Sequence, residues 1–301
     1  MELSISNQNF LDAFDEVDID SANFGKNKLN LFVLKINANE FDYCNLQRQL
    51  LEPMVDFSLS RIVKAKYKDK PAELSRNARD KFINYINNKG ELGELLLYCF
   101  LELHLKAPKI LSKLELKTST NHYVNGADGV HYLKLENGNY QLIFGESKTE
   151  RQLTSGLTNA FRSIAEFKTE VNASGNNKSG INYEKILISN NIGKESLLDG
   201  EVDFIKNIIY PKKENNFEVD DAFGIFIGYE ISISNDNKGL SNEDFRTTIK
   251  DQIKKEVERK IRHIRLKINK HNLQGHNFYI YVLPFTNLDE SRENITKNIT
   301  A

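Results

Sequence analysis

The sequence predicts an α/β protein with a mixed central sheet that helices cover on both faces. Two observations carry this prediction. Several strand-like runs are apolar at successive positions, as residues 142–144 are, so both faces of those strands must lie against other elements. Segments with a helical periodicity alternate with these runs along the chain, which is typical of helices packed on a sheet.

The predicted strands consist of apolar, β-branched and aromatic residues bounded by Asn, Gly or Ser. They span residues 28–36, 109–118, 128–135, 139–148, 184–190, 221–233 and 277–285. Loops rich in Asn and Ser are expected at 171–180, 210–216 and 234–244.

The predicted helices span residues 43–65, 71–88, 90–105, 152–168 and 242–270. The second begins with Pro71, which suits the first turn of a helix. The third is strongly apolar. The last carries an apolar stripe at spacings of four and three, formed by Ile249, Ile253, Val257, Ile261, Ile264 and Ile268.

The composition fits an ordinary globular protein, with 40% hydrophobic and 28% charged residues among 301. We expect residues 1–88 to form a mostly helical region packed on a core of residues 89–301, together one compact unit. The net charge of −1 excludes a general attraction to nucleic acid. The N-terminus is polar and no run reaches about 18 apolar residues, so we expect a cytoplasmic protein with Cys44 and Cys99 as reduced thiols.

The stretch LIFGESKTE, residues 142–150, places Glu146 and Lys148 on the same side of a central strand, because side chains alternate along a strand. A carboxylate near the core is costly unless a charge meets it. The ammonium of Lys148 could balance the charge of Glu146, and a metal ion bound by further carboxylates would balance it better.

Asp128 is the second candidate acid, and the preceding hairpin decides its position. A two-residue loop, Asn137-Gly138, would set Asp128 opposite Ser147. A three-residue loop of residues 136–138, with Gly138 in the left-handed conformation, sets Asp128 opposite Glu146. We favour the three-residue loop, partly because of the chemistry that it permits.

Glu94 is the third candidate acid. It belongs to a narrow polar stripe on the apolar helix 90–105, formed by Glu91, Glu94, Tyr98 and Glu102. Such a stripe often faces solvent, and we expect this of Glu102. For Glu94 the spacing leaves a solvent-facing and a sheet-facing position equally open.

An Asp, a Glu-x-Lys pair and a helical Glu are what metal-assisted cleavage of a phosphodiester requires. Hard carboxylate oxygens select Mg²⁺ or Mn²⁺. The metal polarises the phosphoryl oxygen and lowers the pKa of a bound water. Lys148 would hold the attacking water and offset the developing negative charge.

This pattern resembles the PD-(D/E)xK nuclease superfamily over about residues 90–168: an acidic helix, an Asp that opens a strand, then a Glu-x-Lys strand and a helix. The Pro-Asp dipeptide usual in the superfamily is absent, since Ala127 precedes Asp128. The fuller set of segments resembles, over most of the chain, the HamA family, the nuclease component of the Hachiman antiviral defence system of bacteria. These segments are GELGELLLYCFLE, GADGVHY, FGESKTE, GIFIGYE and FYIYVLPF.

The resemblance implies a restriction-endonuclease-like fold and a metal-dependent endonuclease that cleaves DNA. By motif position, Glu94 matches the helical acid, Asp128 the acid that opens the strand, and Glu146 and Lys148 the Glu-x-Lys pair. The implied metal ligands are Asp128, Glu146 and Glu94. The implied partner is a HamB-like superfamily 2 helicase, which restrains the nuclease until infection or DNA damage.

Two further regions could contact nucleic acid or a partner. The segment 246–270 has ten Lys or Arg residues against three acidic ones, including Lys254, Lys255, Arg259 and Arg262. A solvated helix face explains such a run as a default. Arg151 and Gln152 precede a helix N-terminus, where phosphate is attracted and where ordinary capping occurs equally often.

Two other functions remain open on the sequence. One is a non-catalytic module that binds nucleic acid or a partner, and the other is an enzyme of this fold that acts on RNA or a nucleotide. His131 is expected to be structural, and no histidine has a zinc-finger spacing. No phosphate-binding loop for ATP occurs.

Overall fold

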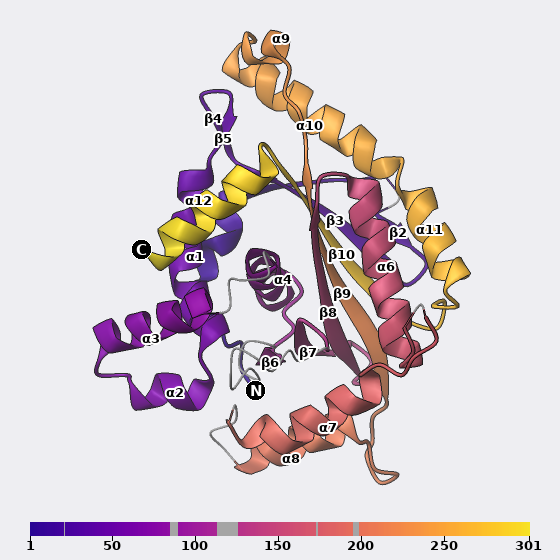
Figure 1. Ribbon diagram of the computed structural model, residues 1–301. Coiled ribbons are helices and arrows are strands. Elements are labelled where there is room, and N and C mark those ends of the chain that lie inside the picture. The colour runs from indigo at the N-terminus through magenta and orange to yellow at the C-terminus, as the bar shows by residue number, and fades with distance from the viewer. Residues whose placement is uncertain (21, 85–89, 113–125, 173, 195–198) are drawn as a thin grey trace.

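The computed structural model describes residues 1–301 except 21, 85–89, 113–125, 173 and 195–198. Its elements form three layers, with a sheet in the middle (Figure 1). On one face lies α4 (Glu91–Leu103), and beyond it α1 (Tyr43–Ser58) and α12 (Leu288–Thr300). On the other face lie α6 (Leu153–Thr169), α10 (Asn242–Glu258) and α11 (Ile261–Lys270). The predicted α/β class, with a mixed sheet between helices, is confirmed.

Eight strands of the described chain form this sheet, in the order β1-β3-β10-β9-β8-β7-β6 with β2 beside β3. Strands β3, β10, β9 and β8 are parallel neighbours, whereas β1, β2, β7 and β6 pair antiparallel. The strands are β1 (Phe14–Val17), β2 (Asn23–Phe24), β3 (Asn27–Leu34), β6 (Lys109–Ser112), β7 (Gly129–Lys134), β8 (Tyr140–Glu150), β9 (Val219–Glu230) and β10 (Phe278–Phe285). A separate small hairpin consists of β4 (Ile36–Asn37) and β5 (Glu40–Phe41).

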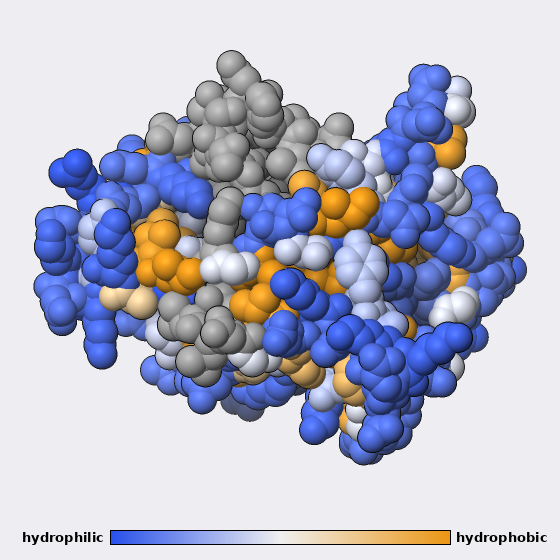
Figure 2. Space-filling view, turned by 90° about the horizontal axis from the view of Figure 1, so that it is seen from below, coloured by the Kyte–Doolittle hydropathy of each residue, from blue (hydrophilic) through white to orange (hydrophobic). Residues whose placement is uncertain are grey.

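The remaining helices lie at the periphery. They are α2 (Arg61–Lys66), α3 (Pro71–Asn84), α7 (Ile181–Asn191), α8 (Asp199–Ile209) and α9 (Asn235–Lys238). Helices α7 and α8 cover the lower end of the sheet in Figure 1. Viewed from that side, the surface is largely hydrophilic with apolar patches between the polar residues (Figure 2). No helix of the described residues combines the length and apolar character that crossing a membrane would need.

The β7–β8 hairpin has the predicted register. Val130 pairs with Phe144 and Tyr132 with Leu142, and the last paired residues before the turn are Lys134 and Tyr140. The amide of Leu135 donates to the carbonyl of Asn139 at 2.8 Å, which leaves residues 136–138 as a three-residue loop. Gly138 has φ +87°, the left-handed conformation that this loop requires.

Three predicted helices and strands differ from the structure, and the loop predicted at 234–244 contains the short helix α9 and the start of α10. Residues 184–190, predicted as a strand, belong to helix α7, where Ile181, Glu184 and Ile188 are buried at a helical spacing and Ile186 is 50% exposed. A short apolar run does not distinguish a strand from a helix by periodicity alone. The predicted helices 43–65 and 242–270 are each divided, at residues 59–60 and 259–260. The predictions for 85–88 and 113–118 lie outside the described residues.

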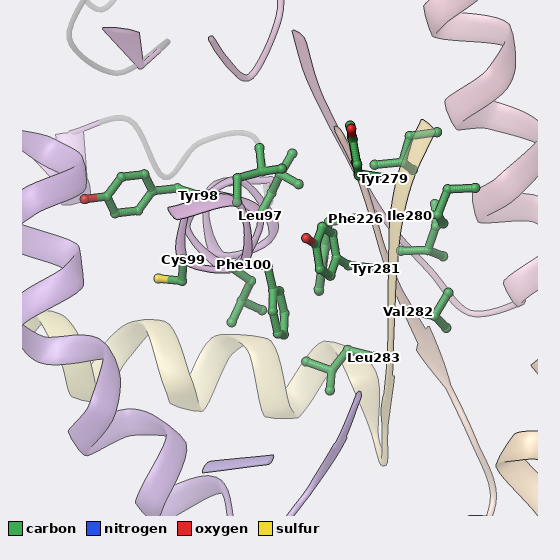
Figure 3. Close-up of a cluster of buried hydrophobic side chains, with 14 of the residues drawn as sticks. Leu97, Tyr98, Cys99, Phe100, Phe226, Tyr279, Ile280, Tyr281, Val282 and Leu283 are labelled. Carbon is green, nitrogen blue, oxygen red and sulfur yellow. The ribbon is translucent and has the colours of Figure 1, made fainter. Parts of the chain in front are cut away.

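Aromatic and aliphatic side chains fill the space between α4 and the sheet (Figure 3). Phe100 of α4 stacks on Tyr281 of β10, with ring centroids 5.1 Å apart and planes 11° apart. Tyr98 points away from the sheet in Figure 3. This apolar layer fixes α4 and therefore the position of Glu94 at its N-terminal end.

The polar stripe of α4 does not face solvent at Glu102, so that expectation was wrong. Glu102 is fully buried and accepts hydrogen bonds from the backbone amides of Ser4, Ile5 and Lys109 at 2.6, 3.0 and 2.6 Å. The Tyr98 hydroxyl lies 2.8 Å from Ser4 Oγ. The N-terminal segment thus covers the stripe and satisfies its carboxylate, as a buried charge requires.

Candidate functional site

Asp128 and Glu146 lie on one wall of a cavity in the described part of the chain. The β7–β8 pairing reaches Val130 and Phe144. Beyond it the backbone amide of Asp128 donates to the carbonyl of Gly145 at 2.9 Å, which holds Asp128 next to the strand residue that precedes Glu146. Both carboxylates line the cavity together with Lys148. The structure therefore brings together three of the four predicted catalytic residues.

Lys148 and Glu146 form an ion pair, with Lys148 Nζ 2.5 Å from Glu146 Oε1. Their side chains are 29% and 15% exposed. The Oδ2 atom of Asp128 accepts a hydrogen bond from the amide of Ser147 at 2.8 Å. Charge-assisted hydrogen bonds of this kind orient a carboxylate. The site thus has two oriented carboxylates and one amine next to them.

The opposite wall of the cavity comes from α6 and the segment that follows it. Ser163 of α6, Lys178 and Ser179 contribute the polar groups, and Ile164 and Phe167 contribute apolar ones. Sequence reasoning missed all three polar residues. Lys178 and Ser179 belong to a loop that its Asn and Ser content identifies only as a connection, and no local signal shows which surface that loop covers.

Glu94 approaches from the other face of the sheet. Its neighbour Gly93 is so close to β8 that an added Cβ would lie 2.3 Å from Ser147 Oγ, and Ser147 points to the face opposite Glu146. Glu94 lines a second, much smaller cavity together with Asp128, Gly129 and Gly145. Glu94 and Asp128 therefore both line this second cavity, and Glu94 does not line the larger one.

The donor set suits a hard divalent ion. Asp128 and Glu146 supply carboxylate oxygens on one cavity wall, and Mg²⁺ is commonly bound by one or two carboxylates with water and substrate phosphate as its other ligands. Among the described residues no group of three His, Cys, Asp or Glu side chains is arranged to hold a metal ion.

His131 has a structural position, on the α4 side of β7. Its Nδ1 lies 2.9 Å from the carbonyl oxygen of Ala107, to which the neutral ring donates. Burial lowers the pKa of His131 to about 3. A ring that stays neutral and hydrogen-bonded in the interior fits the predicted structural role.

The residues predicted to contact nucleic acid or a partner lie away from the cavity lining. Arg151 forms an exposed ion pair with Asp289, at 3.2 Å, and Gln152 is the exposed residue that precedes α6. Lys254 Nζ lies 3.3 Å from Asp20 and 3.8 Å from Glu258. Lys255, Arg259 and Arg262 are exposed. Their contacts with DNA or a partner remain a prediction.

One comparison with known proteins agrees with the family resemblance of the sequence. The model of the family described as HamA matches residues 8–299, nearly the whole chain. The search of curated proteins finds no match.

Proposed function

The chain belongs to the HamA family, which makes it a component of the Hachiman antiphage defence system, and from this premise we propose that it is a metal-dependent endodeoxyribonuclease. It would cleave DNA in the cytoplasm under the control of a HamB-like superfamily 2 helicase. The observation that carries the proposal is the pair of carboxylates, Asp128 and Glu146, on one cavity wall beside the amine of Lys148.

The residues of this wall have distinct roles in the proposed reaction. Asp128 and Glu146 would hold Mg²⁺ or Mn²⁺, and the Ser147 amide fixes the direction of the Asp128 carboxylate. The ion, when bound, polarises the phosphoryl oxygen and makes a bound water more acidic. Lys148 would orient the attacking water and offset the negative charge that develops on the phosphate. Glu94 would bind metal-associated water or steer Lys148.

A plasmid-cleavage assay with the purified chain and Mg²⁺, alone and with its helicase partner, tests the proposal. Replacing Glu146 or Lys148 by Ala should lower the cleavage rate by at least about a hundredfold, because each removes a group that acts on the reacting phosphate. Glu150→Ala is the matched control: Glu150 lies on the same strand and face, bonds Asn159 at 2.9 Å, and does not line the cavity.

The assay has clear contrary outcomes. Cleavage by Glu146→Ala at the parent rate would refute the assigned role of this residue, provided that unfolding midpoints show equal folding of both proteins. EDTA should abolish cleavage by the parent. The same assay with RNA separates a deoxyribonuclease from an enzyme that acts on RNA.

A second candidate function is a non-catalytic module that binds nucleic acid or a partner. The observation that favours it is the ion pair between Lys148 and Glu146, which already balances the carboxylate without a metal ion. Such a module would bind DNA without cleaving it in Mg²⁺, with or without the helicase, so the plasmid assay distinguishes the two functions.

A further inference from the structure

We propose that Lys178, assisted by the hydroxyls of Ser163 and Ser179, holds the phosphodiester backbone of bound DNA at the cavity wall opposite the two acids. This inference rests on the proposed function, because it concerns the substrate of the same cavity. It assigns a substrate-holding role to a residue outside the Glu-x-Lys pattern.

The loop that carries Lys178 joins α6 to α7 (Figure 1). Contacts with the end of α6 hold this loop in place. The amide of Lys178 donates to the carbonyl of Glu170 at 2.7 Å, and Val171 pairs with Asn177 in a short bridge. Gly180 lies so close to α6 that an added Cβ would be 2.2 Å from the carbonyl oxygen of Phe167. These contacts set the backbone of Lys178 at the cavity rim.

The charges of the cavity favour a polyanion once a metal ion is present. Among the described residues, its lining brings two carboxylates, Asp128 and Glu146, and two amines, Lys148 and Lys178. These four charges balance, so a divalent cation would leave an excess of two positive charges. Lys148 is paired with Glu146 on the wall that carries the two acids, whereas Lys178 lies on the other wall and is the amine placed to meet a phosphate across the cavity.

Glu166 holds Lys178 in the absence of DNA. Lys178 Nζ lies 2.9 Å from Glu166 Oε2, and both side chains are partly exposed. A lysine is a flexible point charge that can change partners. The ammonium can therefore exchange the carboxylate of Glu166 for a phosphate.

The alternative role for this ion pair is purely structural, as a tie between α6 and the loop. The two roles predict different signs for two variants. If Lys178 only ties the loop, Lys178→Ala and Glu166→Gln break the same tie and affect DNA binding in the same direction. If Lys178 holds phosphate, removing Glu166 releases an ammonium for DNA and strengthens binding, whereas removing Lys178 weakens it.

The test measures binding of a fluorescent DNA duplex by anisotropy at several salt concentrations, with Mg²⁺, in the full chain carrying Lys148→Ala, which slows cleavage and keeps both proposed metal ligands. We expect Lys178→Ala to raise Kd about tenfold and to reduce the slope of log Kd against log salt by about one. Lys178→Arg should restore most of the binding, and Glu166→Gln should lower Kd. Lys185→Ala is the matched control, because Lys185 is ion-paired with Asp221 at 2.9 Å outside the cavity lining.

Two results would overturn the inference: an unchanged Kd and salt slope in Lys178→Ala, or shifts of the same sign in Lys178→Ala and Glu166→Gln. If the parent cleaves DNA and either of these results is found, the proposed nuclease function stands and only the role of Lys178 is overturned. Binding that depends on Lys178, with no metal-dependent cleavage by the parent, would support the phosphate contact and overturn the nuclease. Absence of DNA binding by the parent would overturn both.

Discussion

The imidazole of His131 is buried between β7 and α4, where it donates to the carbonyl of Ala107 and lies near the ring of Tyr98. Burial lowers its pKa from 6.5 to about 3. Between these two pH values the unfolded chain binds a proton at this residue that the folded chain does not bind. The contribution of His131 to stability is therefore fully present above pH 6.5 and is lost as the pH falls.

This residue gives a prediction about the pH dependence of stability. Replacing His131 by Asn keeps an N–H group that can donate to Ala107 and removes the titrating ring. Between pH 6 and pH 4 the parent should lose about 1.4 kcal/mol per pH unit more than the variant. Urea unfolding at a series of pH values measures both slopes, and equal slopes would contradict the pKa shift.

Glu102 shows what determines the environment of a single charged residue. Its position in a polar stripe on an apolar helix fits exposure to solvent, yet the carboxylate is fully buried under residues 4 and 5. The spacing of a helix identifies which residues share a face. It does not identify what covers that face, and here a segment nearly a hundred positions away in the sequence does so.

At the scale of elements, close packing positions α4 on the sheet. Glycines on both sides of the contact make the approach possible. An added Cβ at Gly224 of β9 would lie 2.9 and 3.0 Å from the two methyl carbons of Leu101, and one at Gly145 of β8 would lie 3.1 Å from Leu97. The helix that carries Glu94 is therefore set at a fixed distance from the strands that carry the site.

A comparison of two glycines tests this packing. Gly224→Ala should destabilise the fold by about 1–3 kcal/mol, because the buried leucine above it has to move within a filled core. Gly200→Ala, in α8, meets nothing within 4 Å and should leave stability unchanged or raise it by up to about 1 kcal/mol. The unfolding midpoints in urea measure both effects, and a stable Gly224→Ala protein would show that α4 has room to move.

For the whole molecule, the sheet joins segments from both ends of the chain. Strand β3 pairs with β10, and β1 pairs with β3, so residues before 35 extend the sheet that carries the site. All eight residues of β10 are buried. Without β3, an apolar strand would become an exposed edge, which is a template for aggregation.

We therefore expect the fragment 89–301 to aggregate or to lack a cooperative unfolding transition, and the full chain to unfold in one transition. Expression of both proteins under the same conditions, followed by thermal unfolding monitored by circular dichroism, makes the comparison. A soluble fragment that unfolds cooperatively at the temperature of the full chain would show that residues 1–88 are a separate unit.

The candidate site divides into parts that the sequence predicts and parts that it does not. The sequence predicted the hairpin register, because a three-residue turn with Gly138 is a local feature that sets the pairs from Lys134 and Tyr140 to Val130 and Phe144. It likewise determined the strand alternation that places Lys148 beside Glu146, and the buried stripe of residues 249–268.

Only the tertiary structure decided what lies opposite these residues. Three features depend on contacts between segments far apart in the chain. They are the small cavity that Glu94 shares with Asp128, the position of Lys178 across the larger cavity, and the burial of Glu102 under the N-terminal segment. Residues 184–190 form a helix for a related reason, since a short apolar run takes the conformation that its packing partners allow. Local periodicity is fixed by the backbone, whereas these contacts are fixed by how the layers fit together.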